Sequence, residues 1–219
     1  MCIRDRGLST YLGRKRVIVM YYAKFPAIQI EPDKNPNEDV LKAIAAEKQK
    51  CVEDLYPVEL VLCTEGPNLN RDYWLPHILE IAAPTIIYKP GNIDHLTESQ
   101  SEVQPRKIVG VAYDSWIGEH RGKKAIFAKA VIYKYLYQED PDVSKLISDI
   151  EEGIAKVSME CAFTKYYAVD ENGEIVDLKA EELEDPEMVG IHGKYYRAFG
   201  EDVVFTAFAF LVDKKPADR

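Results

Sequence analysis

The stretch KVSMECAF (156–163) carries a serine where covalent chemistry is possible. Its apolar residues alternate with polar or small ones, and this period of two is typical of a strand with one face in the core. Ser158 and Glu160 then share the opposite face. That face could be the solvent-exposed side of a sheet, which is common. Alternatively, the rigid strand presents Ser158 as a nucleophile.

A serine hydroxyl becomes a useful nucleophile when a base lies within hydrogen-bond reach, and the chain has four histidines. His95, in YKPGNIDHL, is the best candidate, because it follows Asp94 and opens a polar loop, where functional residues are common. His77 lies in an apolar helical stretch, which favours a structural role. His120 falls in a charged turn and is expected to be solvated, and His192 lies between two glycines in a loop.

Other chemistries find no support in the sequence. It contains no phosphate-binding GxxxxGK[ST] or GxGxxG loop, no GxSxG elbow and no HExxH. The four cysteines show no CxxC spacing, so neither a zinc site nor a redox dithiol is predicted. Cys161 is a further possible nucleophile, but alternation places it on the apolar face, where a thiolate is costly to form. We therefore expect no cofactor and no metal.

The elements that must position these residues are mostly strands. Periodicity and turn residues predict strands at 17–30 (interrupted at Pro26), 58–64, 85–90, 107–117, 124–135, 156–168 and 202–212. Helices are predicted at 39–55, 75–84 and 141–153, with Asn37 as an N-cap and Gly153 as a C-cap. The segments 65–74 and 91–105 are expected to be loops. The fold class is therefore α+β and β-rich: a mainly antiparallel sheet or barrel with a few flanking helices.

Composition limits the partners. The 219 residues carry a net charge of −9, which argues against nucleic-acid binding. No apolar run approaches the roughly 20 residues needed to cross a bilayer, so no membrane association is expected. Residues 170–187 carry nine acids against one lysine and are predicted to form an exposed excursion after an Asn-Gly turn. The opening MCIRDR (1–6) looks like translated adaptor sequence and is given no structural weight.

Several motifs occur in an order that resembles a known family. They are LCTEGPNLNRDYW (62–74), YKPGNIDH (88–95), KIVGVAYDSWI (107–117), IEEGIAKVSMECAF (150–163) and FTAFAFLVDKKPAD (205–218). In this order they resemble the prohead (capsid maturation) serine proteases of tailed phages, which are distant relatives of the herpesvirus assemblins. The resemblance covers about residues 58–218. It implies that Ser158 and His95 are the catalytic pair and that the fold is assemblin-like.

The third catalytic residue is ambiguous. Relatives use a histidine or an acid, and some place a glutamate in the terminal strand, where this chain has only Phe208 or Ala209. Glu160 is the preferred substitute, because residues i and i+2 on one strand face lie about 6.6 Å apart and an imidazole could hydrogen-bond to both side chains. Asp202 and Asp94 are the alternatives.

The resemblance implies a serine endopeptidase that cleaves scaffold and capsid-protein segments in the host cytoplasm, inside the assembling prohead. A homo-oligomer is one expected state. The alternative is a non-catalytic capsid or scaffold component that keeps the protease fold. Residues 58–219 would form the protease domain, and residues 1–57 an N-terminal extension of uncertain role.

Overall fold

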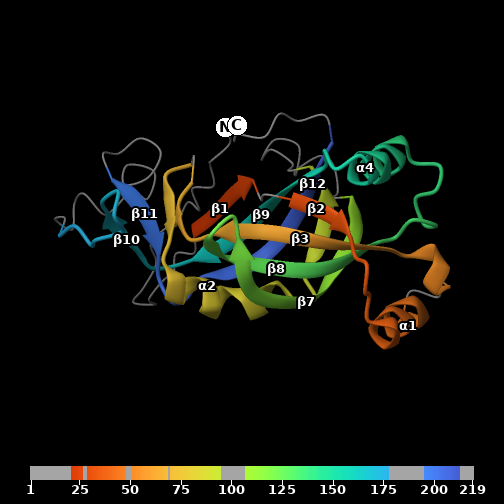
Figure 1. Ribbon diagram of the computed structural model, residues 1–219, viewed down its shortest axis with the longest axis horizontal. Helices are drawn as coiled ribbons and strands as arrows, with labels where there is room; N and C mark the ends of the chain where they lie inside the picture. Colours follow the sequence, from red (N-terminus) through yellow and green to blue (C-terminus); the bar gives the residue numbers. More distant parts are fainter. Residues whose placement is uncertain are drawn as a thin grey trace, which may run out of the picture.

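A computed structural model of the chain shows a strand-rich α+β fold built on one curled sheet (Figure 1). The structure describes residues 21–26, 29–47, 51–68, 70–94, 107–177 and 195–212; for residues 21–26 and Gln29 it describes the backbone alone.

The strands, in chain order, are β1 (Tyr21–Pro26), β2 (Gln29–Pro32), β3 (Tyr56–Thr64), β4 (Gly66–Pro67), β5 (Asp72–Trp74), β6 (Pro90–Ile93), β7 (Ile108–His120), β8 (Lys123–Ile132), β9 (Lys156–Phe163), β10 (Tyr166–Val169), β11 (Tyr196–Phe199) and β12 (Val204–Leu211). The helices are α1 (Glu38–Glu47), α2 (Pro76–Ala82) and α4 (Pro141–Glu151), with short 3-10 segments η1 (Val52–Asp54) and η2 (Ala83–Ile86). None of the helices in these described ranges is both long and apolar enough to cross a membrane.

The main sheet has eight strands in the order β1-β9-β12-β6-β7-β8-β3-β2. Its two edge strands, β1 and β2, are separated by only two residues in the chain, so the sheet must curl until its edges approach each other. Most neighbours are antiparallel, but β6 and β12 run parallel. The predicted α+β, β-rich class is confirmed, and the sheet is mixed rather than purely antiparallel. Within residues 1–57, expected to be an N-terminal extension of uncertain role, the described part contains the edge strands β1 and β2 and the helix α1.

A second, four-stranded sheet lies at the opposite end of the molecule from α1 and α4 (Figure 1). Its order is β10-β11-β5-β4, and β5 and β11 are parallel. The segment expected to be a loop at 65–74 forms β4 and β5. The predicted single strand at 156–168 is divided between the two sheets, because the chain bends at Thr164 and Lys165 between β9 and β10.

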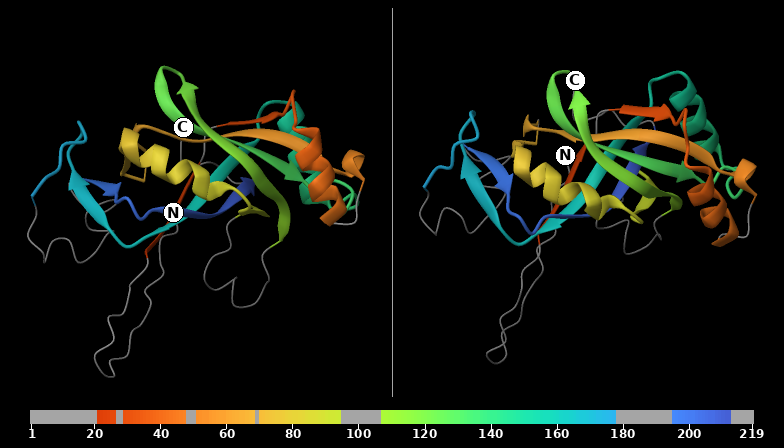
Figure 2. Two further views of the ribbon diagram at one scale, coloured as in Figure 1. Left: turned by 90° about the horizontal axis from the view of Figure 1, so that it is seen from below. Right: turned by 60° about the horizontal axis from the view of Figure 1, so that its bottom comes forward.

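The hydrophobic core lies inside the curl of the main sheet. Aromatic and aliphatic residues of β3, β8, β9 and β12 point into it, and α2, η2 and α4 pack on the same cluster. A smaller cluster joins α1 to the outer surface of β7 and β8. Figure 2 shows the long β7–β8 hairpin twisting out of the sheet. Its turn is only Arg121 and Gly122, both at positive φ as a tight hairpin turn requires, rather than the six residues expected.

The capping predictions are confirmed. The Asn37 side chain accepts a hydrogen bond from the Val40 N–H at 3.1 Å at the start of α1. Gly153 follows α4 with φ at +72°, the left-handed conformation that favours glycine. Helix α1 is shorter than predicted, because the chain at 51–55 forms η1 and then extends into β3.

The predicted strand at 85–90 is wrong, and so is the expected loop where it begins, because residues 91–93 form a strand. Residues 95–105 of that loop lie outside the described residues. The run APTI forms η2, in which Pro84 occupies the first turn and the Thr85 hydroxyl donates to the Ala82 carbonyl oxygen at 2.7 Å. The strand instead begins at Pro90 and includes Gly91, Asn92 and Ile93.

Candidate functional site

Strand β9 separates Ser158 and Glu160 from the hydrophobic core. Val157, Met159 and Cys161 belong to the core cluster and are fully buried. By the alternation of the strand, Ser158 and Glu160 lie on the outer face of the sheet. That face is not solvent-exposed, because each of the two residues is only 4% exposed. Of the two interpretations of the sequence, the simple solvent-facing surface is therefore wrong.

On one side of β9, strands β12 and β6 place small side chains and one amide in the row of Ser158. On the other side, Pro26 of β1 pairs with Ser158, and Lys24 pairs with Glu160. Ala209 of β12 pairs with Ser158 on one side and with Asn92 of β6 on the other. Directly paired residues share a face, so Ser158, Ala209 and Asn92 form one row across three strands, and Ala207 pairs with Glu160 in the next row. Two strand spacings separate Ser158 from Asn92, which is about 9.6 Å.

The position of Gly91 supports this assignment of faces. A Cβ atom built at Gly91 would lie 2.6 Å from the ring of Phe208 and 3.1 Å from that of Phe210, so position 91 faces the core. Asn92 therefore faces outward with Ser158. It is 2% exposed, and neither its amide nitrogen nor its amide oxygen has a hydrogen-bond partner in the part of the chain that the structure describes.

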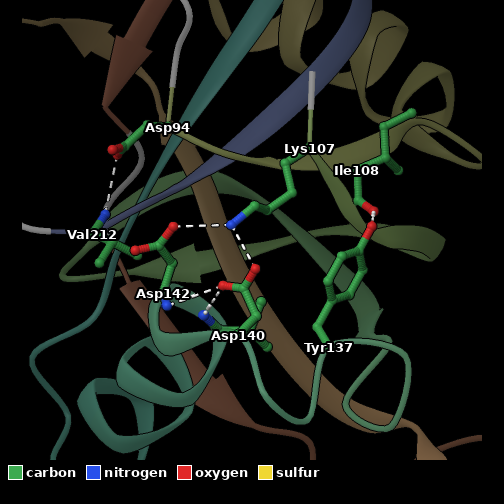
Figure 3. Close-up of polar contacts among 8 residues, drawn as sticks. Asp94, Lys107, Ile108, Tyr137, Asp140, Asp142 and Val212 are labelled. Carbon is green, nitrogen blue, oxygen red and sulfur yellow. Dashed lines mark hydrogen bonds and ion pairs between the residues drawn. The ribbon is translucent and has the colours of Figure 1, made fainter. Parts of the chain in front are cut away.

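The chain leaves β6 at Asp94 with its backbone fixed to β12. The Asp94 N–H donates to the Phe210 carbonyl oxygen at 2.8 Å. The Asp94 carboxylate accepts a hydrogen bond from the Val212 N–H at 3.1 Å, as Figure 3 shows. Asp94 has φ at +51°, a left-handed conformation that aspartate tolerates better than most residues. His95, the predicted base, lies outside the described residues, as do residues 96–106.

The chain re-enters the described structure at Lys107, which is also anchored. Its ammonium group donates to carboxylate oxygens of Asp140 at 2.7 Å and of Asp142 at 3.0 Å, at the start of α4 (Figure 3). The hydrogen bond to Asp140 is the largest cause that raises the pKa of Lys107 above its usual value; burial opposes it, and the hydrogen bond to Asp142 adds to the increase. Nearby, the Tyr137 hydroxyl donates to the Ile108 carbonyl oxygen at 2.8 Å. The described residues on either side of 95–106, Asp94 and Lys107, are thus held by β12 and by the start of α4.

The three candidate acids occupy different places. Glu160 shares the outer face of β9 with Ser158. Asp94 is adjacent to His95 in the chain, and its carboxylate bonds to β12. Asp202 instead holds the bend after β9, where it accepts hydrogen bonds from the Thr164 N–H at 2.7 Å and from the Thr164 hydroxyl. Thr164 is six residues from Ser158, about 20 Å along an extended chain, so Asp202 is remote from the serine.

The other candidate residues are His77, His120, His192 and Cys161. His77 is exposed on α2, so the structural role expected for it is wrong, and His120 is half-buried at the far end of β7. Burial lowers the pKa of His120, with a smaller contribution from Arg121. His192 lies outside the described residues. Cys161 is fully buried on the core side, as alternation predicted. Within the described ranges, no group of three or more His, Cys, Asp or Glu side chains is arranged to hold a metal ion.

Comparisons with protein-family models, with curated proteins and with solved structures found no match. The description of the site therefore depends on its residues alone: a serine and a carboxylate on one buried strand face, two alanines beside them, and an amide across the row. Sequence reasoning missed Asn92. Its only local signal, a PGN triplet, is typical of a turn, and its burial arises from strands distant in the sequence.

Proposed function

We propose that this protein is a serine endopeptidase of phage capsid maturation, with Ser158 as nucleophile and His95 as general base. The observation that carries the proposal is the outer face of β9. On this face a buried serine and a buried carboxylate are adjacent, because the side chain of Met159, which lies between them in the chain, points into the core. A carboxylate two residues from the serine on the same strand face is placed to orient a histidine that serves the serine and to stabilise its charged form.

The register supports His95 as the partner. Strand β6 ends at Ile93, which pairs with Phe210 of β12, and Phe210 pairs with Val157 beside Ser158. Asp94 is bonded to the same part of β12. Asp94, the residue that precedes His95 in the chain, is therefore held two strand spacings across the sheet from the start of β9, the strand that carries Ser158.

The mechanism follows from these roles. The Ser158 Oγ attacks the carbonyl carbon of the scissile peptide bond while His95 accepts the hydroxyl proton. The tetrahedral intermediate collapses, the C–N bond breaks, and His95 donates that proton to the leaving amine. A water molecule, deprotonated by His95, then attacks the acyl ester and releases Ser158. Glu160 orients the imidazole and stabilises its charged form.

The substrate class comes from the resemblance in sequence to prohead proteases, and the curled, strand-rich sheet is compatible with an assemblin-like fold. The expected substrates are segments of the scaffold and capsid proteins, cleaved inside the assembling prohead. The protein would work without a metal or cofactor, because the serine, histidine and acid provide the complete acyl-transfer chemistry.

The proposal is tested by co-expressing the protein with its neighbouring scaffold and capsid genes and measuring substrate trimming by mass spectrometry. We expect Ser158→Ala and His95→Gln to abolish trimming, since loss of a nucleophile or base typically costs on the order of 10⁶ in rate. Glu160→Gln should lose a smaller part of the trimming activity. Ser115→Ala is the matched control, because Ser115 is a partly buried strand serine on β7 whose hydroxyl bonds to the Ala83 carbonyl oxygen. Full trimming by a folded Ser158→Ala variant would refute the proposal.

One observation favours the second candidate, a non-catalytic capsid or scaffold component. Ser158 is only 4% exposed, so a substrate can reach it only if the atoms covering it move. A wild-type protein that assembles with the capsid components but trims none of them would support this alternative.

A further inference from the structure

Asn92 is a buried polar side chain without a structural purpose in the described part of the chain. Both of its amide atoms are buried and lack hydrogen-bond partners there, although the residue is only 2% exposed. Nearly all buried polar groups in proteins are hydrogen-bonded, and leaving one unpaired destabilises the fold. An isosteric leucine would avoid that cost at this position. The asparagine therefore needs a reason outside the packing of β6.

Its position supplies that reason. Asn92 lies in the same row as Ser158, and only Ala209 stands between them in the register. Ala207 and Ala209 are the residues of β12 that pair with Glu160 and Ser158, whereas the core side of the same strand carries Phe205, Phe208 and Phe210. The outer face of β12 therefore carries only small side chains between the serine and the amide. The amide lies at one side of this alanine surface and the nucleophile at the other.

We propose that the Asn92 amide binds the main chain of the peptide substrate next to the scissile bond; this inference rests on the proposed function of Ser158. A primary amide offers both a donor and an acceptor. Because both are unpaired, the best complement is a group that presents an acceptor and a donor together, as a peptide main chain does. The row from Ser158 to Asn92 spans about 9.6 Å, so the bound peptide unit lies within about three residues of the scissile bond.

The test compares two probes that react with a nucleophilic serine. One is a simple alkyl fluorophosphonate, and the other is a phosphonate carrying an acetyl-Ala-Ala-Ala peptide. We expect Asn92→Leu to lower the second-order labelling rate constant of the peptidyl probe roughly tenfold, the effect of losing about two main-chain hydrogen bonds. Labelling by the alkyl probe should stay within about twofold. Asn92→Ala should give the same change in the ratio of the two rates, and Asn35→Leu, at an exposed asparagine after β2, is the matched control.

A second measurement separates a binding role from a structural one. If the amide has no partner in the free protein, Asn92→Leu should keep or raise the melting temperature while it lowers peptidyl labelling. A melting temperature that falls by several degrees, or an unchanged ratio of peptidyl to alkyl labelling, would overturn the inference. Absence of alkyl labelling in the wild-type protein would instead refute the proposed role of Ser158, and the inference about Asn92 with it.

Discussion

Removal of Arg197 should destabilise the fold strongly, because it leaves the carboxylate of Asp72 buried and unpaired. Arg197 donates from Nε to Asp72 Oδ1 at 2.8 Å, and its Nη2 bonds to the same oxygen. The two side chains are 3% and 1% exposed. Breaking such a buried pair from one side costs about 3–5 kcal/mol, whereas replacing both partners with apolar residues of similar volume is often neutral or stabilising. The pair matters for the site because the guanidinium also lies 5.3 Å from the ring of Phe163, the last residue of β9.

Urea unfolding of Arg197→Met and of the double variant Arg197→Met/Asp72→Leu measures this effect. We expect the single variant to lose about 3–5 kcal/mol, or about 6–20 °C in melting temperature for a chain of this size. The double variant should recover most of the loss. Lys42→Met is the control, because Lys42 and Glu38 form an exposed pair and their separation should cost under about 0.5 kcal/mol. A single variant that loses less than about 1 kcal/mol, or a double variant as unstable as the single, would refute the reasoning.

Two further predictions concern Gly91 of β6 and Asp202, which precedes β12. Gly91→Ala should cost about 1–3 kcal/mol, because the new methyl group would meet the Phe208 ring 2.6 Å away; an unchanged urea midpoint would contradict the assigned face of β6. Burial alone would raise the pKa of Asp202, but hydrogen bonds from the Thr164 hydroxyl and the Thr164 and Lys165 N–H groups outweigh it and lower the pKa. The stabilisation from this carboxylate is therefore present above its unfolded pKa of about 3.9 and lost as the pH falls through the lower folded value. The difference in unfolding free energy between wild type and Asp202→Asn should shrink below about pH 4, and a difference independent of pH would contradict this.

Much of the fold follows from local patterns. The N-cap of α1 at Asn37 and the glycine after α4 are set by residues within one turn of each helix, and the alternation in β9 predicts which of its residues enter the core. These features are visible in the sequence because each depends on neighbours in the chain.

The errors arise where distant residues decide the structure. The run TIIY reads as a strand from its composition, but Pro84 and the Thr85 hydroxyl favour the short helix η2. Strand β5 has three residues, and its partner β11 is more than a hundred residues away, so neither shows a usable period. The burial of Ser158 and Asn92 likewise depends on the curl of the sheet, which no local pattern reports.

The central claim is that Ser158 is a nucleophile, and the most direct test is to find where a fluorophosphonate attaches. The wild-type protein is incubated with the alkyl probe, digested with trypsin and mapped by tandem mass spectrometry. The account predicts an adduct on Ser158 in the peptide VSMECAFTK (157–165), absent from Ser158→Ala and strongly reduced in His95→Gln. A wild-type protein without an adduct on this peptide, or one labelled equally in Ser158→Ala, would contradict it.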